Sequence, residues 1–310
     1  MLRLIGVELF KLKKRWLLYM LLIALLAFSI IPIIADYSSY NTILKNNPGI
    51  EDIDITEIPS GGDGVIFGEM PTPLQRTAIR AASLKESFTL PGSIEGVFST
   101  IAGLGPILVI ILAASAIGSE YRWGTLRQML VKGTGRAGYL GSKLIGIAIA
   151  IIAGIIIALL SVFITSLITT WLATGGISWD FLSLDFIGHL FSSLGRILLI
   201  LGVYFTLAAL FTVWLRSVTA GMIIGIIFIS AESIIIALLS GSSGWLADIV
   251  PYTIGHNIQE LTGSYIFGIP DYANTKDLFA WLKPVAILLT YCTALLAAGF
   301  YAFRRQDITA

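Results

Sequence analysis

The sequence predicts an all-α integral membrane protein, and three observations support this fold class. Hydrophobic residues make up 56% of the 310 residues and charged residues only 13%, about half the charged content of a typical soluble domain. The apolar residues gather in runs of about 20 or more, the length that a helix needs to cross the hydrocarbon core. These runs lack the alternating pattern of barrel strands, and in lipid only a helix or a closed barrel satisfies its own backbone groups. The runs are therefore predicted to be transmembrane helices.

Six runs reach this length, so we expect six transmembrane spans within one membrane domain that covers residues 1–310. The first run follows a basic segment, as the core of a secretory signal would. It exceeds the roughly 7 to 15 apolar residues of a cleavable signal, so we expect it to be retained as the first span. The predicted spans are Trp16–Ala35, Val97–Ile117, Leu144–Ala173, Leu194–Leu215, Ala220–Leu239 and Leu282–Phe303.

The basic residues are distributed unevenly among the connecting segments, and this asymmetry predicts the orientation. Residues 1–15 and 118–143 each carry five Lys or Arg, and segments of this kind stay on the cytoplasmic side. The acidic, proline-rich segment 36–96 and the base-poor segment 241–281 are then outer loops. We expect turns and short helices in the first, and interfacial or re-entrant apolar patches in the second. An even number of spans places both termini in the cytoplasm of a multi-pass protein of the cell (plasma) membrane.

The N-terminal residues 1–15 have the pattern of an amphipathic helix that lies on the membrane surface. The polar residues, among them Glu8, Lys11 and Arg15, lie mostly off the apolar stripe. They are expected to face anionic lipid headgroups or a cytosolic partner. An ordinary basic flank that only sets the topology is the alternative. The stripe has helical spacing and consists of Leu2, Ile5, Leu9, Leu12 and Trp16.

The link 118–143 between the second and third spans is longer than a hairpin between two helices requires. It combines one acid, Glu120, with five basic residues, several aromatic residues and an apolar set that one helix face can present. Helix–helix connections usually need only about 2 to 8 residues. The link is therefore predicted to contain a short cytosolic helix against which a partner can push.

Within this link stands the stretch Glu120-Tyr-Arg-Trp-Gly124-Thr125-Leu126-Arg127, followed by Arg136 and Lys143. This pattern resembles that of a known family, the permease subunits of type-2 ABC exporters. In that family an acid followed by Gly-Thr marks the coupling region between spans two and three. The N-terminal elbow helix, the six spans and the Phe303–Asp307 ending are also similar to the family's layout. The sequence Val131-Lys-Gly-Thr-Gly departs from it, because many members have a proline turn there.

The resemblance implies a set of partners and contacts. A permease of this family pairs with a second permease copy or homologue and with cytosolic ABC ATPase subunits, and its coupling helix sits in a cleft of the ATPase. Membrane lipid is a further expected partner. By carry-over from the family motif, the residues expected to contact the ATPase are Glu120, Tyr121, Arg122, Gly124, Thr125 and Arg127.

Gly133-Thr-Gly135-Arg-Ala-Gly138 matches the dinucleotide-binding fingerprint letter for letter, but no predicted strand precedes it and no βαβ unit surrounds it, so it does not predict a cofactor site. The sequence contains no phosphate-binding Gly-Lys-Ser/Thr pattern, so ATP and magnesium are expected on the partner ATPase and this chain is not expected to be an enzyme. His189 and His256 lack companion ligands at metal spacing, so no metal site is predicted. The net charge of +1 gives no reason to expect a nucleic acid partner.

An ion- or proton-coupled secondary transporter is the main alternative to an exporter permease, and an intramembrane enzyme is a third. Transporters of the secondary class commonly use intramembrane charges, yet only Arg196 and Glu232 fall well inside predicted spans. We expect these two either to contact each other or to separate, with Glu232 lining the substrate path and Arg196 reaching outward. The substrate class stays open between peptide, antibiotic, lipid and ion.

Small residues at intervals of four recur in two predicted spans. They are found in the third span at Gly146, Ala150 and Gly154, and in the fifth span at Gly221 and Gly225. Such spacing lets helix backbones approach closely. The partner helix lies either in the same chain or in a second subunit.

Overall fold

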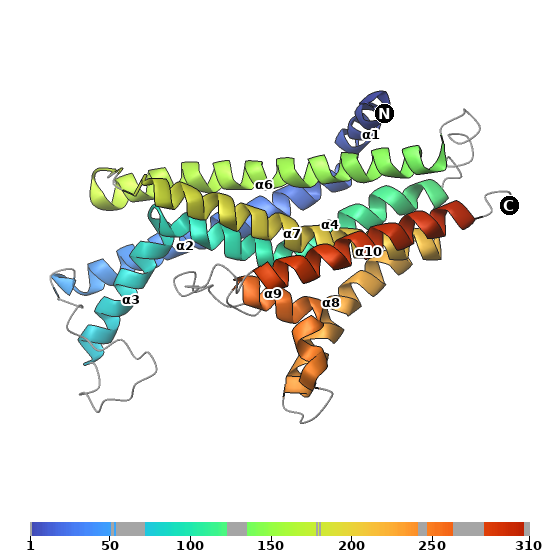
Figure 1. Ribbon diagram of the computed structural model, residues 1–310. Helices are drawn as coiled ribbons and strands as arrows, with labels where there is room; N and C mark the ends of the chain where they lie inside the picture. The colour runs from blue at the N-terminus through green and yellow to red at the C-terminus, as the bar shows by residue number, and fades with distance from the viewer. Residues whose placement is uncertain are drawn as a thin grey trace. The chain divides into compact units, whose positions relative to one another are not determined.

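The computed structural model describes residues 2–50, 53, 72–122, 135–177, 179, 181–240, 247–262 and 282–306. In these ranges the chain is helical and has no β-strand, as the sequence predicts (Figure 1). The elements in order are α1 (Leu2–Lys13), α2 (Trp16–Asn46), α3 (Pro73–Phe88), α4 (Gly92–Arg122), α6 (Arg136–Thr174), α7 (Leu184–Leu215), α8 (Val218–Ser240), the 3₁₀ helix η2 (Ala247–Tyr252), α9 (Ile254–Thr262) and α10 (Leu282–Arg305).

Six of the described helices are long and apolar enough to span a membrane, which confirms the predicted number of spans. They are α2, α4, α6, α7, α8 and α10. Several extend beyond the apolar runs from which they were predicted. The helix α2 continues past Ala35 to Asn46, and α6 begins at Arg136, ahead of the run at Leu144. Hydropathy marks the part of a helix that lies in lipid, whereas the helix itself continues for as long as its backbone and packing support it.

The helices are divided between two compact units. Unit 1 comprises residues 1–25, 98–157 and 187–310, and unit 2 comprises residues 26–97 and 158–186. The helices α2, α4, α6 and α7 contribute to both units, because the divisions fall within them. The sequence predicts a single domain, with the segment 36–96 as an outer loop of turns and short helices.

Close approach of helix backbones at small residues holds unit 1 together. A Cβ added to Gly225 of α8 would lie 2.7 Å from Cγ2 of Ile110 in α4, and one added to Gly221 would collide with Oγ1 of Thr212 in α7. The small residues of the fifth span therefore pack against helices of the same chain. Lipid tails are as apolar as the helices, so this steric fit contributes more to association in a bilayer than hydrophobic burial does.

Unit 2 is organised around Phe88, the last residue of α3, whose side chain is completely buried. The rings of Tyr37 and Tyr40 in α2 pack against it, with centroids 5.5 and 5.3 Å away. Its carbonyl oxygen accepts hydrogen bonds from the hydroxyls of Ser166 and Thr169 in α6 at 3.0 Å each. Phe88 thus attaches α3, a short helix of the predicted outer loop, to α2 by ring packing and to α6 by hydrogen bonds.

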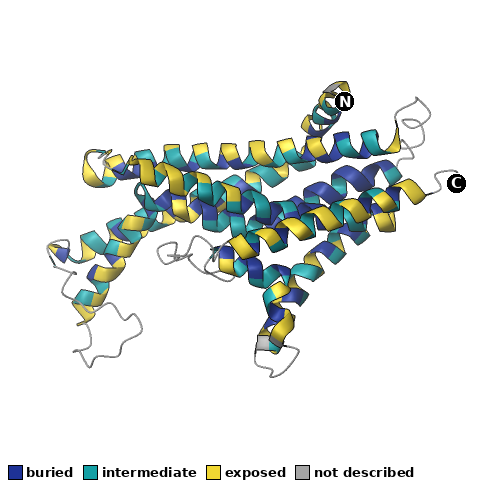
Figure 2. Cartoon of the chain, in the orientation of Figure 1, coloured by how far each residue is buried: buried dark blue, intermediate teal, exposed yellow. Residues whose placement is uncertain are grey.

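Apolar side chains cover the outer faces of the long helices. Figure 2 shows exposed residues recurring along α6 and α10. On α6 the exposed residues include Ile145, Ile149, Ile152 and Ile156, at helical intervals of four, three and four. A continuous apolar stripe of this kind would be unfavourable in water and is typical of a lipid-facing surface.

Candidate coupling site

The candidate site lies where α1, the end of α4 and the beginning of α6 meet in unit 1. Glu120 and Tyr121 belong to the last turn of α4, and Lys143 lies in the third turn of α6. The predicted contact residues Gly124, Thr125 and Arg127 fall in the interval 123–134, which lies outside the described residues. The structure therefore describes both ends of the predicted coupling segment.

Four charged side chains of this region form a closed set of ion pairs, which we call the charge ring: Glu8, Lys11, Glu120 and Lys143. The Lys143 ammonium lies 2.7 Å from Oε1 of Glu120 and 2.9 Å from Oε2 of Glu8. The Lys11 ammonium lies 2.8 Å from Oε1 of Glu8 and 3.3 Å from Oε1 of Glu120. Each acid thus contacts both bases, and the ring joins α1 to α4 and to α6.

Three members of the charge ring are buried, Lys11 is half-buried, and each of the four side chains is paired with two others. Lys143 is only 3% exposed, and Glu8 and Glu120 are nearly as inaccessible. Burial by itself raises the pKa of Glu8, but the ammonium groups of Lys143 and Lys11 outweigh it and hold this pKa below its ordinary value. Burial likewise lowers the pKa of Lys11, but Glu8 and Glu120 reverse the effect and raise it. Charges taken out of water are tolerated only with this kind of compensation.

Glu120 receives both of its ion pairs through one oxygen. Within the described part of the chain, its second oxygen, Oε2, is buried and accepts no hydrogen bond. The carboxylate therefore depends on Lys143 and Lys11 for its compensation. Its position inside the protein also means that Glu120 presents no open surface to a partner in this structure.

Arg15, which follows α1, strengthens the attachment to α4. It donates hydrogen bonds from Nη1 to the carbonyl of Ser115 at 2.9 Å and from Nη2 to the hydroxyl of Ser119 at 2.7 Å. Partial burial lowers the pKa of its guanidinium. From the sequence we expect Glu8, Lys11 and Arg15 to face headgroups or a partner. The structure turns these three side chains toward the protein, because their partners lie on helices that are distant in sequence.

The end of α10 forms a second connection between the two sides of the link. The Tyr121 hydroxyl donates to Oε1 of Gln306 at 3.0 Å, and Gln306 donates through Nε2 to the carbonyl of Val213 in α7. On the other side of the link, Arg136 donates from Nη1 to the carbonyl of Arg304 at 2.8 Å and to that of Gln306 at 3.0 Å. Gln306 was not singled out from the sequence, where its only signal was its place in the basic C-terminal ending.

The structure thus brings five of the predicted site residues into one neighbourhood and leaves others apart. Glu8, Lys11, Arg15, Glu120 and Tyr121 all lie within the contacts just described. Arg122 is exposed at the end of α4. Arg196 and Glu232 belong to a different part of unit 1.

Arg196 and Glu232 each contact an end of α9. Oε1 of Glu232 accepts the backbone N–H of Gly255 in the first turn of α9 at 2.7 Å. Nη1 of Arg196 donates to the carbonyl of Leu261 in its last turn at 3.4 Å. An acid at the N-terminus and a base at the C-terminus both complement the helix dipole. Among the described residues no ion pair joins Arg196 to Glu232, so the direct contact that was one of the two expectations is not formed. Each of the two side chains contacts a backbone group of α9 instead.

Comparison with known proteins places this architecture in a family. Neither a curated protein nor a solved structure gave a match to the chain. A family model described as ABC-2 family transporter protein matches residues 9–308, nearly the whole chain. This match agrees with the six apolar helices and with the resemblance seen at Glu120 to Lys143. The chain therefore belongs to the ABC-2 transporter family and is a membrane-spanning permease of an ABC transporter.

Proposed function

We propose that this chain forms the export pathway of its transporter together with a second permease copy, and that a separate ATPase subunit drives it through the 118–143 segment. The observation that carries this proposal is the charge ring. It connects α4 and α6 on the two sides of the link, through Glu120 and Lys143, and it ties both of them to α1. ATP and magnesium would be bound by the partner ATPase. This chain would convert the energy of ATP hydrolysis into movement of its spans.

The geometry supports a direct mechanical role for the charge ring. A push on the segment between Arg122 and Gly135 reaches α4 and α6 through the backbone. The ion pairs at Lys143 then oblige both helix ends to move together with α1, because separating them would leave charges buried without partners. The contacts of Gln306 with Tyr121 and of Arg136 with the end of α10 extend this block to α10. In this scheme a displacement at one cytosolic segment is distributed over several spans.

The proposal gives different roles to the residues of the family motif. Glu120 acts as an internal brace, since its carboxylate is buried against two lysines. Arg122, which is exposed, is proposed to contact the ATPase together with Gly124, Thr125 and Arg127. Tyr121 is proposed to hold the end of α10 rather than the partner.

The test is purification of the tagged full-length chain from its native membranes in a mild detergent. We expect an ATP-binding subunit to be recovered with it and to hydrolyse ATP. Arg122→Glu should reduce this recovery, because it reverses a charge at the proposed contact. Glu120→Gln should preserve the recovery of the ATP-binding subunit. Movement of the permease should then change the rate of ATP hydrolysis less than it does in the wild type. Glu260→Gln is the matched control, because it removes an exposed acid on α9.

If the chain were a secondary transporter, the same experiment would give the opposite result. Recovery of the chain without any ATP-binding subunit, together with transport that follows a proton gradient and not ATP, would overturn the proposal in favour of that alternative. Recovery unchanged by Arg122→Glu and by Gly124→Pro would overturn the assignment of the contact to this segment.

A further inference from the structure

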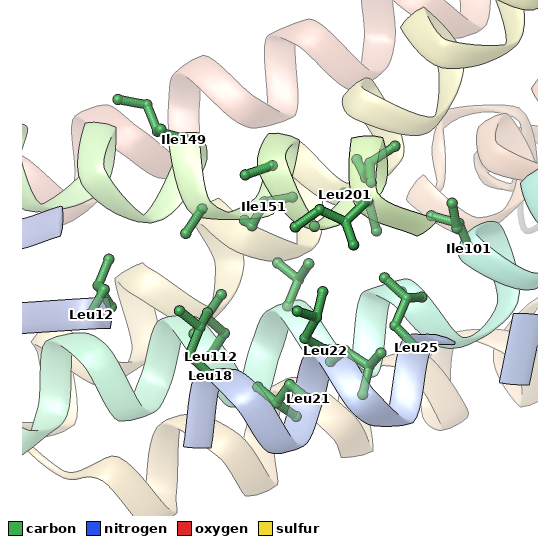
Figure 3. Close-up of a pocket in the computed structure, with 18 of the residues that line it drawn as sticks. Leu12, Leu18, Leu21, Leu22, Leu25, Ile101, Leu112, Ile149, Ile151 and Leu201 are labelled. Atoms are coloured by element: carbon green, nitrogen blue, oxygen red, sulfur yellow. The ribbon is translucent and has the colours of Figure 1, made fainter. Parts of the chain in front are cut away.

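A second feature of unit 1 takes no part in the charge ring. It is an apolar slot of about 330 Å³ that is lined by α2, α4 and α6. Its walls come from residues 18–25 of α2, 101–112 of α4 and 149–157 of α6, with Leu201 of α7 on one side. Figure 3 shows Leu12 near one end of the slot and Leu25 and Ile101 near the other. Its volume is at the small end of the range of ligand sites, roughly 300–1,000 Å³.

The slot has the proportions of a single hydrocarbon chain. Its α4 wall runs from Ile101 to Leu112, a distance of about 16 Å at the helical rise of about 1.5 Å per residue. One leaflet of a bilayer has a hydrocarbon layer of about 15 Å, half of the full core. Ile149 and Ile157, which line the slot, are 40% and 39% exposed. The slot is therefore open sideways along α6, where surrounding lipid has access.

The two ends of the slot differ in chemistry. The end at Leu9 and Leu12 also carries Lys13, whereas the remaining lining is aliphatic or glycine. Lys13 is exposed and forms no ion pair with any described residue, while the nearby Lys11 is held in the charge ring. Trp16, 74% exposed, lies next to this end in sequence, and tryptophan favours the membrane–water interface. An unpaired cation at the interface above an apolar slot is complementary to a lipid with a negative headgroup and an aliphatic tail.

We propose that this slot binds one acyl chain of an anionic phospholipid of the bilayer, with the lipid phosphate beside Lys13. Apolar contact alone gives little preference, because lipid tails in the bilayer are as apolar as the slot. The charge of Lys13 supplies the selection between headgroups. The slot walls supply the selection for an extended chain. This lipid would occupy the space between α2 and α6 and add to the cohesion of α1, α2, α4 and α6.

The experiment uses photoactivatable phospholipids with a diazirine in the acyl chain, added to the purified full-length chain. Labelled peptides are then mapped by mass spectrometry. The phosphatidylglycerol probe should label residues 18–25 and 149–157, and the phosphatidylcholine probe with the same chains should label them much less. Lys13→Gln should weaken the labelling by phosphatidylglycerol by about fivefold, which corresponds to about 1 kcal/mol per basic residue. Lys14→Gln is the control, since Lys14 packs over the ring of Phe10 and does not line the slot.

A second pair of variants tests the slot itself. Gly154 lines the slot and has open space where a Cβ would lie, so Gly154→Leu should fill the slot and abolish the labelling without an internal clash. Ala150→Leu tests the same wall if that variant folds poorly. Gly195→Leu adds the same side chain at an open position of α7 and should leave the labelling unchanged.

Three results would overturn the proposal. The first is equal labelling by the two probes, and the second is labelling that survives both Gly154→Leu and Ala150→Leu. The third is disulfide formation between two copies through Leu21→Cys, with no lipid labelling, which would assign the slot to a second copy of the chain. None of these results depends on an ATPase partner, so the lipid site and the proposed coupling can fail separately.

Discussion

At the scale of single residues, Lys143 is the most deeply buried member of the charge ring, and it compensates the charges of both acids in it. It pairs with Glu8 and with Glu120 while being almost completely buried. Lys143→Met keeps the length of the side chain but leaves both acids undercompensated, and breaking a buried pair in this way costs about 3–5 kcal/mol. We expect a correspondingly lower unfolding midpoint in detergent, measured by denaturant or heat.

The matched control for this change is Lys45→Met, because Lys45 is an exposed lysine at the end of α2. Exposed substitutions usually shift stability by no more than about 0.5 kcal/mol. Addition of Glu8→Gln to Lys143→Met should restore part of the lost stability, because it removes one uncompensated charge. Equal stability of the Lys143→Met and Lys45→Met variants would show that the charge ring does not hold the helices together.

The pKa of Glu8 leads to a prediction about pH. Because its pKa in the folded chain lies below the ordinary value of 4.5, the ionised carboxylate stabilises the fold fully above that value. This contribution is lost as the pH falls through the folded pKa. Lys11 behaves in the opposite sense: its pKa is raised above 10.5, so its contribution is present below 10.5 and is lost as the pH rises through the folded pKa.

The measurement is the difference in unfolding free energy between the wild type and Glu8→Gln, which cancels the titration of other carboxylates. This difference should stay constant between about pH 5 and 7 and shrink toward pH 3. A difference that grows on acidification would contradict the lowered pKa of Glu8.

At the scale of elements, α9 is held at both ends by charges that come from other helices. It packs against α8, α10 and η2, while Glu232 binds its first turn and Arg196 its last. Interactions of charges with helix ends are worth up to about 2 kcal/mol in partly buried positions. Glu232→Ala should therefore raise the population of locally opened α9 by about 5- to 30-fold. Glu232→Gln should raise it less, because the amide oxygen still accepts from Gly255.

Cysteine labelling measures this opening. Ile258 is 7% exposed, so Ile258→Cys in a Cys292→Ala background reacts only when α9 opens. Ser233→Ala is the control on α8, because Ser233 is exposed and its hydroxyl bonds only within its own helix. If Glu232→Ala leaves the labelling rate of Ile258→Cys unchanged, Glu232 does not anchor α9.

At the scale of the whole molecule, the unequal distribution of basic residues predicts the topology. Residues 1–15, the link 118–143 and the C-terminus are expected on the cytosolic side, and the segment near Gly176 on the outer side. In intact cells, a cysteine at Thr134 should resist an impermeant thiol reagent until the membrane is opened. A cysteine at Gly176 should react at once. The reverse pattern would invert the proposed orientation and move the coupling segment away from any cytosolic ATPase.

The sequence predicted the parts of the site but not their assembly. Within the motif from Glu120 to Lys143, the structure places Glu120, Tyr121 and Arg136 in contacts between helices. Contact of this motif with an ATPase stays a prediction. The periodicity of residues 1–15 placed Glu8 on a polar face. That pattern contains no information about Lys143, which lies 135 residues away and compensates its charge. The roles of Gln306 and of Leu261 were missed for the same reason, because a backbone or amide partner leaves no periodic signal.

The sequence by itself determined the fold class, the six spans and the family of this protein. Solvation by lipid decides these features: a run of about 20 apolar residues has to be helical wherever it crosses the bilayer. Only the tertiary structure decided which buried charges meet, where small residues bring helices together, and that α2, α4 and α6 enclose a slot beside Lys13. Those outcomes depend on contacts between helices far apart in the chain, and steric fit and charge compensation fix such contacts only when the helices are packed.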